Sequence, residues 1–278
     1  GEWCATPTTR GWYAPDDPEK GRVFAGDHDP HNGFSAARED TAAFTRPRKW
    51  VAGGFQWVGV EHRGECKWPR LCSASGAVDL FLLKKDAYFQ NQTLMRDEPR
   101  VHILGHWNAP ADGAKIVPVW VYARADRVEL FLNGASLGTR DTRDGRHAEW
   151  QVSYAPGELR AVGYKEDAPV CEDVRHTTGK PVKLHLIPVE PDMPLFTCEC
   201  LDEAGRTVPD AAPYVRFRAE GGVRILATGS DNADPIPPAV PERQMYMGQI
   251  AVYARVSASG ALIAEADGLV PARYEIRA

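Results

Sequence analysis

The sequence has 278 residues, of which 43% are hydrophobic and 26% are charged, which predicts two or three globular domains with cores of their own. The formal net charge is -5 and acidic and basic residues are interspersed, so nucleic acid is not an expected partner. A membrane is not an expected partner either, because no apolar run reaches the length of a membrane span. We recognise no secretion signal at the start of the sequence. The chain opens Gly-Glu-Trp without a methionine, so we expect a trimmed or partial product.

The six cysteines are spaced irregularly and match no zinc-binding pattern. They are Cys4, Cys66, Cys72, Cys171, Cys198 and Cys200. We expect mostly reduced thiols, which favours a cytoplasmic protein, with a secreted or periplasmic one as the alternative. A bridge between Cys66 and Cys72 stays open, and no cofactor is expected.

Residues 1–49 contain prolines and glycines that interrupt any long helix or strand. The run Asp27–His31 carries metal-capable side chains, but it lacks a fixed ligand spacing. We therefore interpret it as a solvated loop and expect no metal site. Residues 36–46 predict a short helix.

The stretch from Trp50 to Trp68 is the most informative part of the first hundred residues. Residues 55–60 are apolar at nearly every position, which predicts a strand buried on both faces of a parallel sheet, and the polar run 61–65 follows. Such an arrangement is typical of the active-site end of a (β/α) barrel strand. A buried strand before a solvated loop is the plainer alternative.

Residues 79–95 predict a helix after this strand. Asp79 is the expected cap of the helix. Lys84, Lys85 and Asp86 are interpreted as its solvated face. Strand, loop and helix together make one β/α unit.

After Pro99 the pattern changes to short strands. Residues 117–124 and 127–133 alternate with period two, and Asn133-Gly134 predicts a tight type I′ hairpin turn. Further strands are expected at residues 147–154, 158–164 and 171–177. Regular short strands of this kind predict an antiparallel sandwich, and residues 178–181 are the expected hinge at its end.

A second series of short strands follows the hinge and predicts an immunoglobulin-type sandwich. Its expected strands are residues 183–189, 196–201, 214–219, 224–228, 249–256, 261–266 and 273–276.

Motifs from one enzyme family occur here in that family's order. Glu2 is followed by Arg10-Gly11-Trp12-Tyr13, at the family's spacing between its nucleophilic glutamate and an Arg-Gly-aromatic motif. Residues 52–65 read A-G-G-F-Q-W-V-G-V-E-H-R-G-E, like the family's last barrel strand. Residues 85–90 read K-D-A-Y-F-Q, like the start of the following helix.

The remaining motifs lie beyond residue 100. His102, Gly105, His106, Trp107 and Asn108 match an H-x-x-P-H-W-N motif, except that Gly105 replaces the proline. Residues 128–138 read V-E-L-F-L-N-G-A-S-L-G, and residues 202–211 match D-x-x-G-x-x-V-P-x-A. The whole chain thus resembles the C-terminal portion of a glycoside hydrolase family 2 enzyme of the β-galactosidase group.

The resemblance implies an α/β plus all-β fold. Residues 1–98 would be the last part of a catalytic (β/α)8 barrel, residues 99–180 a β-sandwich domain, and residues 181–278 an immunoglobulin-like β-sandwich domain. His102 and His106 would then be interdomain contacts rather than ligands.

The implied activity is that of a retaining exo-β-glycosidase, which works through a covalent glycosyl-enzyme intermediate. Glu2 would be the catalytic nucleophile. The acid/base glutamate would lie upstream of residue 1, so we expect the chain alone to be inactive.

The resemblance also implies residues around the substrate. Trp57 would bind the sugar with its indole face, and Glu61 and His62 would lie beside it. The residues that would support the loops are Arg10, Trp12 and Glu65.

Two departures from the family pattern lie near the expected sugar pocket. Glu61-His62 replaces the family's Asp-Tyr, and Ser73-Ala74-Ser75-Gly76 replaces its Ser-Tyr-Phe-Gly. The Asn-x-Lys pair with which glucuronidases of the family hold a carboxylate is absent from residues 72–76, which argues against a uronide. A β-galactoside is therefore the favoured substrate.

The expected partners are a β-glycoside or oligosaccharide substrate and a missing N-terminal part of the same enzyme, and a homo-oligomer stays open. The main alternative is a carbohydrate-binding or spacer module without catalysis of its own. A third hypothesis is an adhesin-like surface protein, although such arrays have no need of the Trp57 strand.

Overall fold

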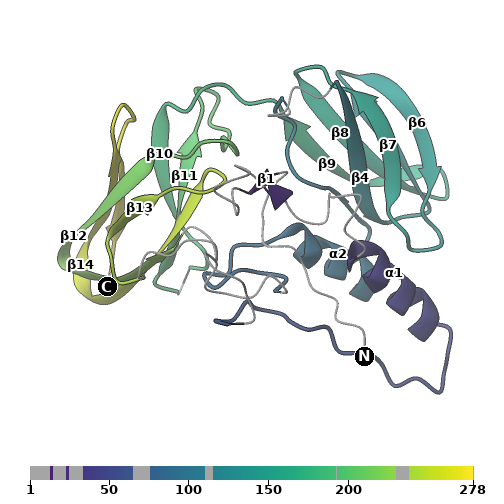
Figure 1. Ribbon diagram of the computed structural model, residues 1–278, viewed down its shortest axis with the longest axis horizontal. Coiled ribbons are helices and arrows are strands. Elements are labelled where there is room, and N and C mark those ends of the chain that lie inside the picture. Colours follow the sequence, from purple (N-terminus) through teal and green to yellow (C-terminus); the bar gives the residue numbers. More distant parts are fainter. Residues whose placement is uncertain are drawn as a thin grey trace. The chain divides into compact units, whose positions relative to one another are not determined.

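A computed structural model of the chain describes residues 13–14, 23–24, 34–64, 76–109, 115–191, 193–229 and 238–277 (Figure 1). The chain divides into two compact units. The first unit comprises Gly1–Glu61, Ala74–Val78 and Lys84–Thr177, and the second comprises His62–Ser73, Asp79–Leu83 and Thr178–Ala278.

Two helices of the first unit, α1 (Phe34–Thr45) and α2 (Asp86–Met95), correspond to the two expected ones. The expected start of the second helix at residue 79 is wrong. Asp79 accepts hydrogen bonds from the backbone N–H groups of Phe81 (2.8 Å) and Leu83 (2.9 Å), which forms a turn instead. The helix therefore begins only at Asp86.

The expected buried strand over residues 55–60 is also wrong. Only Val60 makes a β-bridge, which is parallel and pairs with Val78. Phe55 is fully exposed, and Trp57 is 48% exposed. A strand buried on both faces needs neighbours on both, and among the described residues this segment pairs only with residues 76–78. A short ladder of β1 (Tyr13–Ala14) and β2 (Val23–Phe24) also belongs to this unit.

The first unit contains a sandwich of two antiparallel sheets, as the strand pattern predicts. One sheet has the order β3-β4-β7, with β3 Arg100–Ile103, β4 Ile116–Arg124 and β7 Ala148–Ser153. The other has the order β6-β5-β8-β9, with β5 Arg127–Leu132, β6 Ala135–Asp141, β8 Glu158–Lys165 and β9 Ala168–His176.

The predicted hairpin at Asn133-Gly134 is confirmed. Leu132 pairs with Ala135, and the two turn residues have φ values of 51° and 82°. Positive φ at both central residues is the mark of a type I′ turn, whose twist matches that of the strands. Alternating side chains of both sheets then meet in one core, which includes Val121, Leu130 and Trp150.

The second unit is built on one six-stranded antiparallel sheet of order β10-β11-β14-β12-β13, with β15 also paired to β14. Its strands are β10 Lys183–Pro188, β11 Leu195–Leu201, β12 Tyr214–Gly229, β13 Glu242–Gln244, β14 Gln249–Ala266 and β15 Ala272–Ile276.

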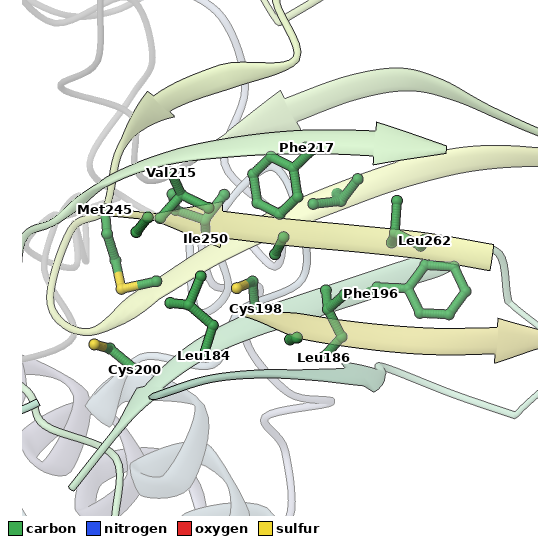
Figure 2. Packing of buried hydrophobic residues seen from close by; sticks show 14 of the residues in the cluster. Leu184, Leu186, Phe196, Cys198, Cys200, Val215, Phe217, Met245, Ile250 and Leu262 are labelled. Carbon is green, nitrogen blue, oxygen red and sulfur yellow. The ribbon is translucent and has the colours of Figure 1, made fainter. Parts of the chain in front are cut away.

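Two strands that the sequence pattern divides are continuous in the structure. β12 spans residues 214–219 and 224–228, and β14 spans residues 249–256 and 261–266. The first half of β14 pairs with β11 and its second half with β15, while β12 runs along both halves. Ile250 lies in the first half of β14, and Phe217 of β12 pairs with Ala264 in its second half. Both side chains belong to one buried cluster (Figure 2). The sheet thus folds over its own core.

None of the helices in the described parts of the chain has the length and apolar character needed to cross a membrane. Cys171, Cys198 and Cys200 are free thiols. Cys4, Cys66 and Cys72 lie outside the described residues, and so does the open question of a Cys66–Cys72 bridge.

Candidate sugar-binding site

Three of the residues expected around a substrate are described by the structure: Trp57, Glu61 and His62. The expected nucleophile Glu2 lies outside the described residues, and so do the expected supporting residues Arg10, Trp12 and Glu65. The metal-capable run Asp27–His31 is outside them too. Within the described part of the chain, no group of His, Cys, Asp and Glu side chains is arranged to hold a metal ion.

Trp57 is half-exposed, and a cis peptide bond joins it to Val58. The backbone that follows runs parallel to residues 76–78. The N–H of Ala77 donates to the carbonyl of Val58 and that of Val78 to Gly59, both at 3.1 Å, and the N–H of Glu61 donates to Val78 at 3.0 Å. The indole therefore stands at the start of an anchored segment and keeps access to solvent.

Glu61 ends this segment and points inward. It is 3% exposed and forms an ion pair with Lys85, which is 2% exposed. Gly76 closes the packing, because a Cβ at that position would lie 2.4 Å from the backbone nitrogen of Glu61. The resemblance implies a place for Glu61 beside the sugar, and in the structure its carboxylate lies against Lys85.

His62 belongs to the second unit and is partly exposed. Its ring nitrogen Nδ1 lies 3.4 Å from the carbonyl oxygen of Arg63.

Lys85 and Asp86 are buried, so the interpretation of this pair as a solvated helix face is wrong, whereas Lys84 is exposed as expected. Asp86 begins α2 and its Oδ1 lies 2.7 Å from Nε2 of His102 on β3. The imidazole of His102 also stacks on the ring of Phe89, with centroids 4.0 Å apart. His102 thus joins α2 to the sandwich within the first unit, and its expected role as an interdomain contact stays a prediction.

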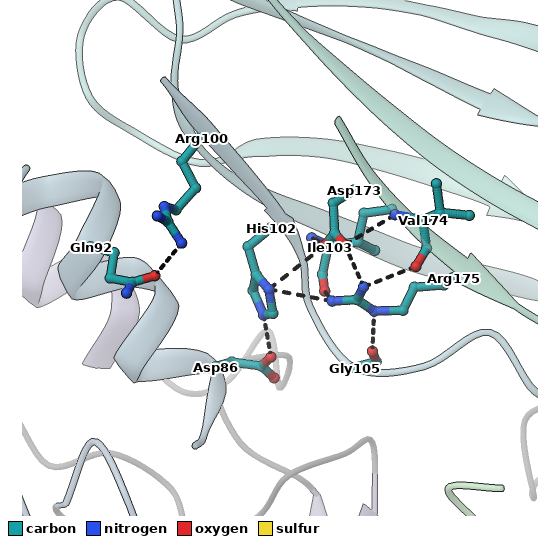
Figure 3. A network of polar contacts seen from close by, with 9 residues as sticks. All are labelled: Asp86, Gln92, Arg100, His102, Ile103, Gly105, Asp173, Val174 and Arg175. Carbon is teal, nitrogen blue, oxygen red and sulfur yellow. Dashed lines mark hydrogen bonds and ion pairs between the residues drawn. The ribbon is translucent and has the colours of Figure 1, made fainter. Parts of the chain in front are cut away.

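A second layer of contacts holds His102 from the sandwich side (Figure 3). Arg175 of β9 places Nη2 3.3 Å from Nδ1 of His102 and donates through Nη1 to Asp173 at 2.7 Å. Asp173 in turn accepts the N–H of Ile103 at 2.8 Å. Sequence patterns do not reveal this cluster, because its members come from α2, β3 and β9.

His106 and Trp107, which the family motif singles out, have structural contacts. Nδ1 of His106 accepts the N–H of Asn108 at 3.1 Å. Trp107 is 1% exposed and donates through its indole nitrogen to the carbonyl of Ala155 at 3.0 Å. Trp107 therefore packs in the core of the first sandwich.

Comparisons with known proteins place these features in a family. The domain of unknown function DUF4982 matches residues 114–171, within the first sandwich. The chain is 32% identical to a beta-galactosidase of Bacteroides ovatus over 217 residues, which are 74% of this chain and 25% of that protein. It is 30% identical to a beta-glucuronidase of Formosa agariphila over 187 residues, which are 63% of this chain and 19% of that protein.

A solved structure from a named glycosidase family is also similar to this chain. A glycosyl hydrolase family 2 member from Bacteroides cellulosilyticus superposes with a TM-score of 0.75 at 25% identity, covering 87% of this chain and 36% of that one. The chain belongs to glycoside hydrolase family 2. It spans about a quarter or less of the length of these curated relatives. In this family 2 chain, the conspicuous motif residues divide between sandwich packing and the segment that begins at Trp57.

Proposed function

We propose that this family 2 chain is part of a retaining exo-β-glycosidase that hydrolyses terminal β-linked sugars. The observation that carries the proposal is Trp57, which is half-exposed at the start of a backbone segment that is itself anchored. A flat apolar ring that keeps access to solvent suits the C–H face of a pyranose.

The chemistry needs two carboxyl groups, one as nucleophile and one as acid and base, about 5–5.5 Å apart. By the family motif, Glu2 attacks the anomeric carbon and forms the covalent glycosyl-enzyme intermediate. The second carboxyl group comes from a barrel strand upstream of residue 1. The chain alone then lacks half of the catalytic pair and is inactive.

A β-galactoside is the substrate that we propose. One of the two curated relatives is named a beta-galactosidase and the other a beta-glucuronidase. The relatives alone therefore do not decide between a galactoside and a glucuronide as substrate. Residues 72–76 read C-S-A-S-G and contain neither the asparagine nor the lysine that a uronide carboxylate would require there. This favours a neutral sugar.

The proposed partner is the remaining part of the (β/α)8 barrel. Apart from the tryptophans, several large apolar side chains are exposed within residues 44–60 and at residue 95 of the first unit: Phe44, Phe55, Val60 and Met95. A pocket of about 330 Å³ lies among α1, α2 and residues 54–56. Exposed apolar residues gathered in this way mark an interaction surface, which suits packing against further barrel strands and helices.

The test compares the purified chain with the same chain expressed together with, or fused to, its upstream sequence. We expect hydrolysis of a nitrophenyl β-galactoside only in the longer form, and much weaker hydrolysis of the matching glucuronide. Turnover by the chain alone contradicts the missing acid/base. Sugar binding without turnover in the longer form supports a binding or spacer module instead.

A further inference from the structure

The backbone around Lys85 is fixed on two sides. Lys85 is the N-cap residue of α2, and its N–H donates to the carbonyl of Ala77 at 3.1 Å. Its neighbour Lys84 forms a β-bridge with Val78. Residues 76–78 therefore lie between the start of α2 and the segment that follows Trp57.

The ion pair of Lys85 and Glu61 connects the start of α2 directly to the end of the segment that begins at Trp57. Both side chains are almost completely buried, so water screens their attraction little. Removing one partner of a buried pair leaves an uncompensated charge, whereas removing both avoids that cost. The end of the Trp57 segment is therefore held by a side chain of α2 as well as by backbone hydrogen bonds.

The start of α2 is held in turn by the sandwich. Asp86 follows Lys85 directly and pairs with His102, which Arg175 contacts from β9. A continuous set of paired groups thus runs from β9 and β3 through the first turn of α2 to Glu61. Displacement of Lys85 would also disturb residues that the sandwich fixes.

We infer that Lys85 is a positioning residue for the sugar site: its ammonium group holds Glu61 in place, and with it the segment that presents Trp57. The inference rests on the proposed role of Trp57 as a sugar platform. It gives the first sandwich a part in the site, because the contacts of Asp86 and His102 hold the turn that carries Lys85.

The test is the variant Lys85→Met, with Lys84→Met as the matched control. Lys84 carries the same charge one residue earlier but is exposed. Hydrogen exchange followed by mass spectrometry reports on the backbone amides of Glu61, Ala77 and Val78, which donate the hydrogen bonds of this segment. We expect at least tenfold faster exchange at these amides in Lys85→Met, and rates close to wild type in Lys84→Met.

The double variant Glu61→Gln/Lys85→Met removes both charges and guards against simple unfolding of Lys85→Met. We expect it to recover part of the protection that Lys85→Met loses. In the longer, active form of the enzyme, we expect Lys85→Met to lower kcat/KM by at least tenfold, mainly through KM, and Lys85→Arg to restore part of it.

Two results overturn the inference: exchange in Lys85→Met equal to that in Lys84→Met, or faster exchange with an unchanged kcat/KM. Absence of glycosidase activity in the longer wild-type form refutes the proposed function instead. The exchange measurement still decides in that case whether Lys85 holds the segment.

Discussion

Gly221 of β12 and Gly260 of β14 are paired across the two strands at the point where the sheet of the second unit folds over. Gly221 has a φ of 65°, and the register shifts between Gly221 and Val223. A Cβ at Gly260 would lie only 2.1 Å from the carbonyl oxygen of Glu220. The two strands can bend together here because neither residue carries a side chain.

The first prediction is that Gly260→Ala destabilises the protein. The added methyl group meets backbone atoms that belong to the opposite strand, so relief requires movement of the sheet. We expect a loss of about 2 kcal/mol or more in the free energy of unfolding, measured by chemical denaturation.

Gly179→Ala is the matched control for that variant. Gly179 lies in the same unit, and a Cβ there would have ordinary contacts of 3.7 Å with Asp202. A change within about 0.5 kcal/mol is expected. Equal effects of the two substitutions would contradict the account of the bend.

The same bend shows which parts of the fold the sequence can and cannot predict. The Asn133-Gly134 hairpin depends on adjacent residues with positive φ, so its signal is local and the prediction succeeds. The continuity of β12 and of β14 depends on the pairing of Gly221 with Gly260, which lie 39 positions apart in sequence, and the pattern around each glycine resembles an ordinary turn. The pattern therefore predicts two strands where the structure has one continuous strand with a bulge.

The candidate site shows the same limit. Trp57 is found from its motif, but Lys85 and Asp86 look like ordinary surface residues of a helix. Their burial follows from partners 24 and 16 positions away, Glu61 and His102 respectively, which no local pattern reveals. Likewise, the apolar run around Phe55 predicts burial, although the described residues do not cover it.

The second prediction concerns Asp202, the first residue of the D-x-x-G-x-x-V-P motif. Burial acts to raise the pKa of this carboxyl group, but hydrogen bonds from the N–H groups of Gly179 and Arg206 and the guanidinium of Arg206 lower it overall, to about 2. The pKa of an unperturbed aspartate is about 3.9, so ionised Asp202 contributes its full stabilisation of the fold above about pH 3.9. This contribution is lost as the pH falls through about 2.

Asp202→Asn tests this linkage. At neutral pH we expect Asp202→Asn to lower the free energy of unfolding by about 1–2 kcal/mol. This is less than the shift in pKa alone implies, because Arg206 is 39% exposed and water screens its attraction to Asp202. The difference between wild type and variant should narrow as pH falls from 5 to 2 in denaturation experiments. A difference that is constant over this range argues against ionisation of Asp202 as the cause.

The third prediction is that Cys198 and Cys200 are unreactive in the folded protein. Both are fully buried. Burial raises the pKa of the Cys198 thiol far above its ordinary range and raises that of Cys200 to about 11, so neither forms a thiolate at pH 8.

Peptide mass spectrometry after brief alkylation at pH 8 measures each thiol separately. Cys171 serves as the internal comparison, because burial also raises its pKa but its side chain is only partly buried. We expect labelling of Cys171 before Cys198 and Cys200, and labelling of all three in urea. Rapid labelling of Cys198 without denaturant is the contrary result.

The fourth prediction separates the sugar-platform role of Trp57 from a packing role. In the longer enzyme form, Trp57→Ala removes the indole face and should lower kcat/KM for a β-galactoside by about tenfold to a hundredfold, or about 1.4–2.7 kcal/mol of transition-state binding. Trp57→Phe should retain part of the activity, because a smaller ring still offers a flat apolar face.

Stability and a second tryptophan supply the controls for Trp57→Ala. Replacement of a core tryptophan by alanine typically lowers the free energy of unfolding by about 3–5 kcal/mol. Trp57 is 48% exposed, so Trp57→Ala should lower it far less. Trp50→Ala removes a tryptophan that is 77% exposed and lies seven residues earlier, and it should leave kcat/KM within about twofold of wild type. If Trp57→Ala unfolds the protein, or if both variants lower kcat/KM equally, the exposed indole acts in packing or assembly, and the sugar contact must be sought elsewhere in the family 2 site.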